Sequence, residues 1–173
     1  MSHVHEDDPA CAVAHGEVRP DTSDRTLVAV FASPVAEFLL RYGADLGFRT
    51  LLLEPDPARA AGWDGPKVIT GPTADLDGRA DVVVTDHHRD ELGPVLRDLL
   101  AVPSRWIGVM GNPRHPAPHV PALRALGVAD DDIARVHRPI GLNIGSRTPA
   151  EIAVATLAGL LADRNGRPGG FEF

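Results

Sequence analysis

Short, continuous apolar runs that alternate with helix-like segments constrain the fold of this chain most strongly. The clearest runs are TLVAVF at 26–31, TLLLE at 50–54 and ADVVVT at 80–85. A strand that is apolar on both faces is typical of a parallel sheet with helices on both sides. KVIT at 67–70 and RWIGVM at 105–110 are two further predicted strands. The spacing therefore predicts an alternating βα chain.

Helical spacing is found between and after these runs, and the predicted helices cover residues 35–48, 91–101, 120–127, 130–136 and 149–166. Strands and helices that alternate in this way form α/β domains. We expect one α/β Rossmann-like three-layer domain, with a mostly parallel sheet of about five or six strands. We expect it to span residues 25–173, after an acidic arm at 1–24.

The arm carries most of the chain's net charge of −7, with six acidic residues against Arg19. Its composition predicts disorder or loose docking. The remaining chain is nearly neutral, which argues against nucleic acid or an anionic membrane as a partner.

No apolar run reaches the ~18 residues of a membrane span, and the N-terminus lacks the charged-then-apolar pattern of a secretory signal. We therefore expect a cytoplasmic protein, and the lone Cys11 fits a reducing compartment. The arm residues His3, His5, Cys11 and His15 match no zinc spacing, so no metal site is expected.

The turn after the first strand, FASPVAEF at 31–38, has no glycine. Dinucleotide-binding folds place a Gly-x-Gly-x-x-Gly fingerprint here, so that the backbone can approach a pyrophosphate. Pro34 also removes a backbone donor. Glu54, however, ends the second strand where a ribose-binding acid would lie. An ordinary helix turn and a nucleotide cradle both remain open.

Two later loops follow strands and should lie at the same edge of the sheet. TDHHRDE at 85–91 offers histidines and carboxylates for metal or proton chemistry, or it is a solvated loop. If His87 and His88 continue the strand they point in opposite directions, so at most one faces a site. GVMGNPRHP at 108–116 offers Asn112 and Arg114 as donors beside two glycines, or it is a plain turn.

The segment HRPIGLNIGSRTPAEIAVA at 137–155 opens the last helix. Thr148 and Glu151 predict a capping box with Pro149 at the first helical position. The cap does not require Gly141, Gly145 or Arg147. Flexible glycines, free amides and an arginine at a helix N-terminus favour a phosphate or carboxylate.

These motifs resemble the Rossmann-type domain of the xanthine dehydrogenase accessory (XdhC/CoxI) family. PIGLNIGSRTPAEIAVA resembles that family's Pro-Ile-Gly-Leu-Asp-Ile-Gly-Ala-Arg-Thr-Pro-Ala-Glu signature, and WIGVMGNPRH and VVVTDHHRD resemble two further segments. Asn143 stands where the family has an aspartate, Pro113 replaces an arginine, and Asp86-His87 inverts a His-Asp pair. The positions that match are Gly108, Gly111, Arg114, Gly141, Gly145, Arg147, Thr148 and His88.

The resemblance implies a chaperone that binds molybdenum cofactor (molybdopterin) as cargo and assists its insertion into a molybdenum hydroxylase apoenzyme such as xanthine dehydrogenase. Arg147 and the amides at 145–149, with Asn143 in the same loop, would hold the phosphate of this cargo. Arg114 and Asn112 would contact the pterin or a second phosphate, and His88 would line the pocket. A homodimer is expected from family habit, and no catalytic residue is assigned.

Two other functions remain open from the residues. An NAD(P)-dependent oxidoreductase would use Glu54 for the ribose and Asp86 or His88 as acid–base. A divergent paralogue would keep the fold and bind only protein.

Overall fold

The computed structural model of the chain describes residues 9–74 and 76–170. Six strands form one sheet in the order β3-β2-β1-β4-β5-β6, and every neighbouring pair is parallel. This confirms the α/β, Rossmann-like fold class. The strands are β1 Thr26–Val30, β2 Arg49–Leu53, β3 Val68–Ile69, β4 Ala80–Val84, β5 Trp106–Val109 and β6 Val136–His137.

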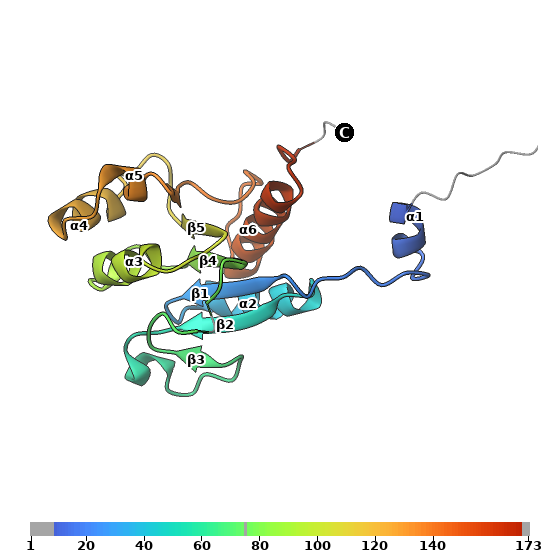
Figure 1. Cartoon of the computed structure of the whole chain (residues 1–173), viewed down its shortest axis with the longest axis horizontal. Coiled ribbons are helices and arrows are strands. Elements are labelled where there is room, and N and C mark those ends of the chain that lie inside the picture. Colours follow the sequence, from blue (N-terminus) through green and yellow to red (C-terminus); the bar gives the residue numbers. More distant parts are fainter. Residues whose placement is uncertain (1–8, 75, 171–173) are drawn as a thin grey trace, which may run out of the picture.

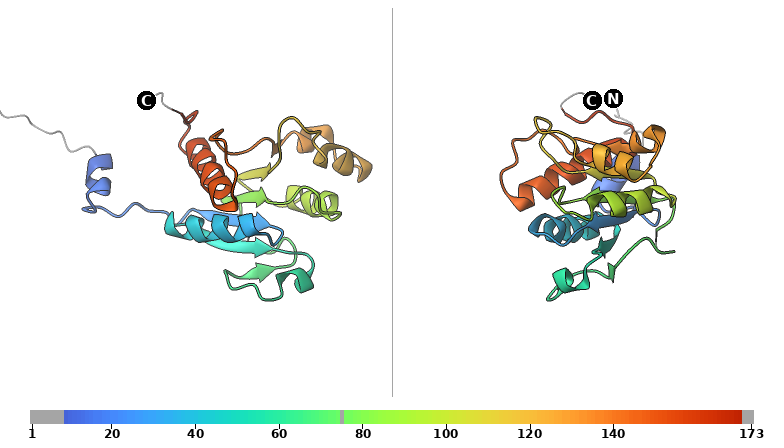
Figure 2. Two further views of the ribbon diagram at one scale, coloured as in Figure 1. Left: turned by 180° about the vertical axis from the view of Figure 1, so that it is seen from behind. Right: turned by 90° about the vertical axis from the view of Figure 1, so that its left-hand side faces the viewer.

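Helices cover both faces of the sheet, which gives three layers (Figure 1). Two helices, α2 and α6, pack against each other on one face, and α3, α4 and α5 lie on the other. Figure 2 shows the same arrangement from behind in its left-hand view and end-on in its right-hand view. The helices are α1 Pro9–Ala14, α2 Pro34–Asp45, α3 Leu92–Leu100, α4 His119–Ala125, α5 Asp130–Ile133 and α6 Pro149–Arg164, with a 3-10 turn η1 at Pro57–Ala60.

The strand predictions are correct where the side chains are buried on both faces of the sheet. All five residues of β1 and of β4 are buried, and so are the last three of β2. Alternate side chains therefore enter two cores, one on each face of the sheet. Leu96 and Leu123 belong to the core beneath α3–α5, and Leu39 and Leu157 to the core beneath α2 and α6.

One predicted element is wrong at its end. Residues 130–136 were expected to be helical, but α5 ends at Ile133 and Val136 lies in β6. The strand forms because Val136 and His137 pair with Ile107 and Gly108 of β5. That pairing comes from the tertiary fold, which local spacing does not contain.

The arm contains the short helix α1, which stands apart from the sheet in Figures 1 and 2. Residues 1–8 lie outside the described part of the chain, and His3 and His5 are among them. The division into an arm at 1–24 and a domain at 25–173 stays a prediction. None of the described helices has both the length and the apolar character that a bilayer span requires.

Candidate functional site

The loops that carry the predicted site leave the carboxyl ends of the parallel strands. The strand order reverses between β1 and β4, and open α/β sheets bind ligands at the carboxyl edge beside such a point. The turn after β1 and the loops after β4, β5 and β6 therefore form the region in which a ligand is expected.

The turn after β1 uses its polar groups within the protein. Phe31 is fully buried with a φ of 73°, a conformation that favours glycine. The amide of Ala32 donates to Glu54 Oε2 at 2.9 Å. Ser33 Oγ accepts from Ala36 N at 3.1 Å, which caps α2, and lies 2.9 Å from Thr85 Oγ1. A buried phenylalanine thus stands where a nucleotide-binding turn has glycine.

The carboxylate of Glu54 is fully buried and fully bonded. Arg89 donates to both of its oxygens, at 2.9 and 3.1 Å, and the amides of Ala32 and Asp56 complete the set. An ionised carboxylate has about four acceptor positions. Burial raises the pKa of Glu54, but these hydrogen bonds outweigh it and hold the pKa below its usual value. In this arrangement Glu54 has no acceptor left for a ribose.

Arg89 was missed by the sequence interpretation, although it lies in the TDHHRDE loop. Its side chain is 7% exposed, and it also bonds Glu91 at 3.1 and 3.3 Å. The guanidinium lies over the Phe31 ring, 4.4 Å from the centroid. Arg89 therefore joins the loop after β4 to the turns after β1 and β2.

The two histidines after β4 do not continue the strand. They lie in a turn in which Asp86 Oδ1 accepts from the amide of His88 at 2.9 Å. The two ring centroids are 4.1 Å apart, so the expectation that the rings point in opposite directions is wrong. Alternation applies to extended backbone, and this backbone is turned. Burial lowers the pKa of His87, and the neighbouring His88 and Arg138 lower it further.

The glycines of the loop after β5 have packing roles. A Cβ on Gly108 would lie 2.2 Å from the Trp106 ring and 2.7 Å from Ile140. A Cβ on Gly111 would lie 2.6 Å from Nη2 of Arg138. Gly108 is therefore needed for close packing against the Trp106 ring, whereas a Cβ on Gly111 would displace the guanidinium of Arg138.

Arg138, at the end of β6, is a second residue that the sequence interpretation missed. It donates to the carbonyl oxygens of Asn112 and His115, at 3.0 and 3.2 Å. Asn112 Oδ1 in turn accepts from the amide of Arg114 at 2.9 Å. The Arg114 side chain is exposed. Arg138 therefore brings the predicted residues Gly111 and Asn112 to the end of β6, with His87 of the β4 loop nearby.

The loop that opens α6 confirms the predicted capping box. Thr148 Oγ1 accepts from Glu151 N at 3.2 Å, and Glu151 Oε2 accepts from the amides of Arg147 and Thr148 at 2.6 and 3.2 Å. Two of the amides that were expected to hold a phosphate are thus already bonded to Glu151. The exposed guanidinium of Arg147 has no partner among the described residues.

Gly141 and Gly145 have left-handed backbones for different reasons. Gly141, with a φ of 84°, lies against α6, where a Cβ would be 3.2 Å from backbone atoms of Ala155 and Thr156. Gly145, with a φ of 70°, has open space around it. Asn143 between them is exposed. Within the described residues, no hydrogen bond or ion pair joins this loop to His88 or Arg114.

Fold and site together define a Rossmann-type domain with a modified nucleotide-binding turn. A family model described as the XdhC Rossmann domain matches residues 27–160. The chain belongs to this family.

The chain is also similar to two other proteins. The uncharacterized protein YqeB of Escherichia coli (strain K12) is 39% identical over 97 residues, which are 55% of this chain and 18% of YqeB. The solved structure of a xanthine dehydrogenase from Bacillus halodurans is similar in fold, with a TM-score of 0.64 at 22% identity, and the match covers 82% of this chain and 45% of that one. The chain thus spans less than half of either protein.

Proposed function

We propose that this chain is an XdhC-like accessory factor, which holds the molybdenum cofactor as cargo and assists its insertion into a molybdenum hydroxylase such as xanthine dehydrogenase. Membership of the XdhC Rossmann family supports the accessory role. The proposed binding site for this cofactor rests on one observation: two exposed arginines, Arg114 and Arg147, lie on the loops that follow β5 and β6.

The cargo chemistry fits these side chains. The pterin cofactor carries a phosphate, or a pyrophosphate in its dinucleotide form, and a guanidinium binds phosphate through paired hydrogen bonds. Neither the Arg114 nor the Arg147 guanidinium is engaged by a carboxylate among the described residues, so both can reach a ligand. Gly145 and Asn143 are exposed beside Arg147, and His88 is exposed on the β4 loop.

The first alternative, an NAD(P)-dependent oxidoreductase, is less well supported. Its ribose acid would be Glu54, whose oxygens are bonded by Arg89 and two amides. Its pyrophosphate turn would contain the buried Phe31. The second alternative, a module that binds only protein, becomes an outcome of the experiment below.

The test is anaerobic binding of molybdenum cofactor to the purified chain, followed by thermal unfolding and by titration. A ligand at about 100 times its dissociation constant stabilises a protein by roughly 2.7 kcal/mol. Loss of a hydrogen bond to a charged group costs about 1.5–3 kcal/mol, so Arg147→Ala should weaken binding by about tenfold or more.

The matched control is Arg97→Ala, because Arg97 is exposed on α3 and pairs with its neighbour Asp98 at 2.8 Å. It should bind the cofactor as the unmodified chain does. NAD, NADP and CTP serve as comparison ligands. Binding of NAD or NADP alone would support the oxidoreductase, and binding of none of the ligands would support the protein-binding module.

A further inference from the structure

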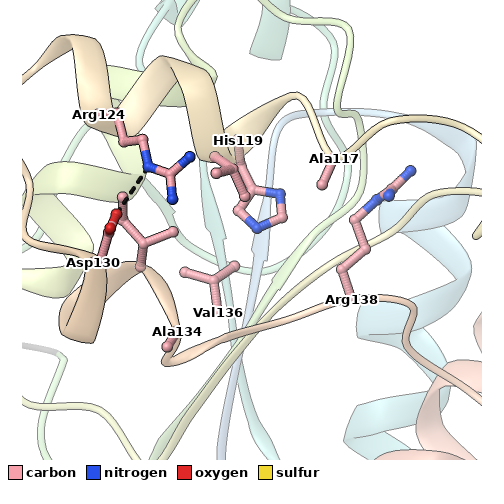
Figure 3. Close-up of a pocket in the computed structure, with 9 residues that line it drawn as sticks. Ala117, His119, Arg124, Asp130, Ala134, Val136 and Arg138 are labelled. Carbon is pink, nitrogen blue, oxygen red and sulfur yellow. Dashed lines mark hydrogen bonds and ion pairs between the residues drawn. The ribbon is translucent and has the colours of Figure 1, made fainter.

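A pocket of about 380 Å³ lies between α4, α5 and β6 (Figure 3). Its apolar wall includes Val120, Ile133 and Val136. Its polar side chains include His119, Arg124 and Arg138. Figure 3 shows the His119 ring in the middle of this group, between the two arginines.

Two buried nitrogen atoms of this pocket lack hydrogen-bond partners among the described residues. They are Nδ1 of His119 and Nε of Arg138. His119 as a whole is only 3% exposed. An unsatisfied buried polar group costs about 1–3 kcal/mol, and native proteins retain few of them. Both atoms belong to side chains that line the same pocket.

The charge of the pocket is also uncompensated. Arg138 has no carboxylate within 4.0 Å among the described residues, and its two Nη atoms are held by backbone carbonyl oxygens. By contrast, Arg89 and Arg164, which are less than 10% exposed, both pair with carboxylates. Arg124 is neutralised by Asp130 at 2.8 Å. The pocket therefore keeps one fixed positive charge.

His119 can supply a second donor to a ligand. Burial lowers the pKa of this imidazole, and the nearby Arg138 lowers it further, so the ring is neutral at pH 7. A neutral imidazole donates from one nitrogen and accepts at the other. With its proton on Nδ1, His119 offers a neutral donor beside the Arg138 cation, against an apolar wall.

We propose that this pocket binds a small oxyanion, a phosphate or a carboxylate group, between Arg138 and His119. An anion with several acceptor oxygens would satisfy both orphaned nitrogens and balance the charge of Arg138. The pocket has room for a small organic anion, since a water takes roughly 30 Å³. The site does not use the side chain of Arg147 or Arg114, but Arg138 also donates to the carbonyl oxygen of Asn112, so the pocket adjoins the loop after β5 that the cargo proposal uses.

The experiment is an NMR titration of the full chain at pH 7.5, with sodium chloride holding the ionic strength constant. The signal is the ring Cε1–H resonance of His119, assigned by its loss in His119→Gln. Inorganic phosphate and succinate are titrated separately to distinguish the two oxyanion types. A saturable shift of this resonance with either anion is expected, and the anion that binds more tightly identifies the type.

Arg138→Lys is the informative variant, because it keeps the charge and removes the Nε–H donor, together with the two Nη bonds to the carbonyl oxygens of Asn112 and His115. Binding should weaken by about tenfold in it, whereas Arg124→Ala, which changes an already paired arginine, should bind within about twofold of the unmodified chain. If neither anion shifts the His119 resonance at 50 mM or below (roughly the weakest binding of interest), water satisfies the two nitrogens and the proposal is wrong. Unchanged affinity in Arg138→Lys would contradict it equally.

Discussion

Arg89, in the loop after β4, donates two hydrogen bonds of 2.9 and 3.1 Å to the carboxylate of Glu54, which follows β2. The guanidinium also covers the ring of Phe31, whose backbone occupies the left-handed region. These three side chains fill the place where a Rossmann domain commonly holds the phosphates and ribose of a nucleotide. The chain has kept the fold while closing that part of the edge with its own residues.

Removing Arg89 should destabilise the fold strongly. Arg89→Met leaves the carboxylate of Glu54 buried without its cation, and breaking a buried pair in this way costs about 3–5 kcal/mol. The exposed pair Arg79–Asp77 gives the control, since solvent screens this pair and Arg79→Met should leave the stability nearly unchanged. Urea unfolding measures both. Equal losses in the two variants would contradict the structural role of Arg89.

The turn after β1, which contains the buried Phe31, also predicts that nucleotides do not bind measurably. Titration of the chain with NAD and NADP by calorimetry should show no saturable binding, because Glu54 has no free acceptor and Phe31 replaces glycine. Dissociation constants of about 1 µM, equivalent to roughly 8 kcal/mol, would require the Glu54–Arg89 pair to open. That result would support the alternative that the protein is an NAD(P)-dependent oxidoreductase.

Close approach between the signature loop and α6 can be tested at Gly159. Alanine is favoured over glycine in a helix by about 1 kcal/mol. A Cβ at Gly159 would nevertheless lie 2.9 Å from Cα of Gly141. We expect Gly159→Ala to destabilise the protein by about 1–3 kcal/mol, the usual cost of overpacking, in chemical denaturation.

A second substitution separates crowding from backbone strain. Gly145→Ala meets no atom within 4 Å, so its cost comes from the φ of 70° alone. That cost is about 1–2 kcal/mol, and Gly145→Asn should recover part of it, because Asn tolerates this conformation. A stabilised Gly159→Ala variant would show that the loop does not rest on α6 as described.

The stability of the protein should depend on pH through His119. Its pKa in the folded protein is lowered from 6.5 by burial and by Arg138, so the unfolded chain takes up the proton first as the pH falls. The stabilisation is present above pH 6.5 and is lost below it. His119→Gln should therefore lose less stability than the unmodified chain between pH 7.5 and 5.5, as measured by urea unfolding. Parallel pH profiles would contradict a neutral, buried His119.

The sequence predicted the central strands well because burial on both faces leaves a continuous apolar run. It also predicted the capping box, since Thr148 and Glu151 are three residues apart and the cap is local. It missed β6, because two residues become a strand only by pairing with β5. The pairing of Arg89 with Glu54, 35 residues away, likewise has no local signal.

For the candidate site, the sequence named residues but not how they are arranged, and the site itself stays a prediction. The glycines of the loops after β5 and β6 were interpreted as ligand contacts, whereas Gly108, Gly111 and Gly141 allow close packing of the protein against itself. Arg138 lies at the start of the 137–155 segment but was given no role from the sequence, because its contact with the loop of Asn112 appears only in the folded structure. Contacts between loops of different strands depend on the order of the sheet, which spacing along the chain does not specify.

Reactivation of a molybdenum hydroxylase apoenzyme tests the accessory role most directly. The apoenzyme is mixed with a limiting amount of molybdenum cofactor, with the chain present or absent, and recovered activity is followed over time. The account predicts faster and more complete recovery with the unmodified chain and with Arg97→Ala, and a clear loss of this effect with Arg147→Ala. Recovery that is the same with and without the chain would contradict the account.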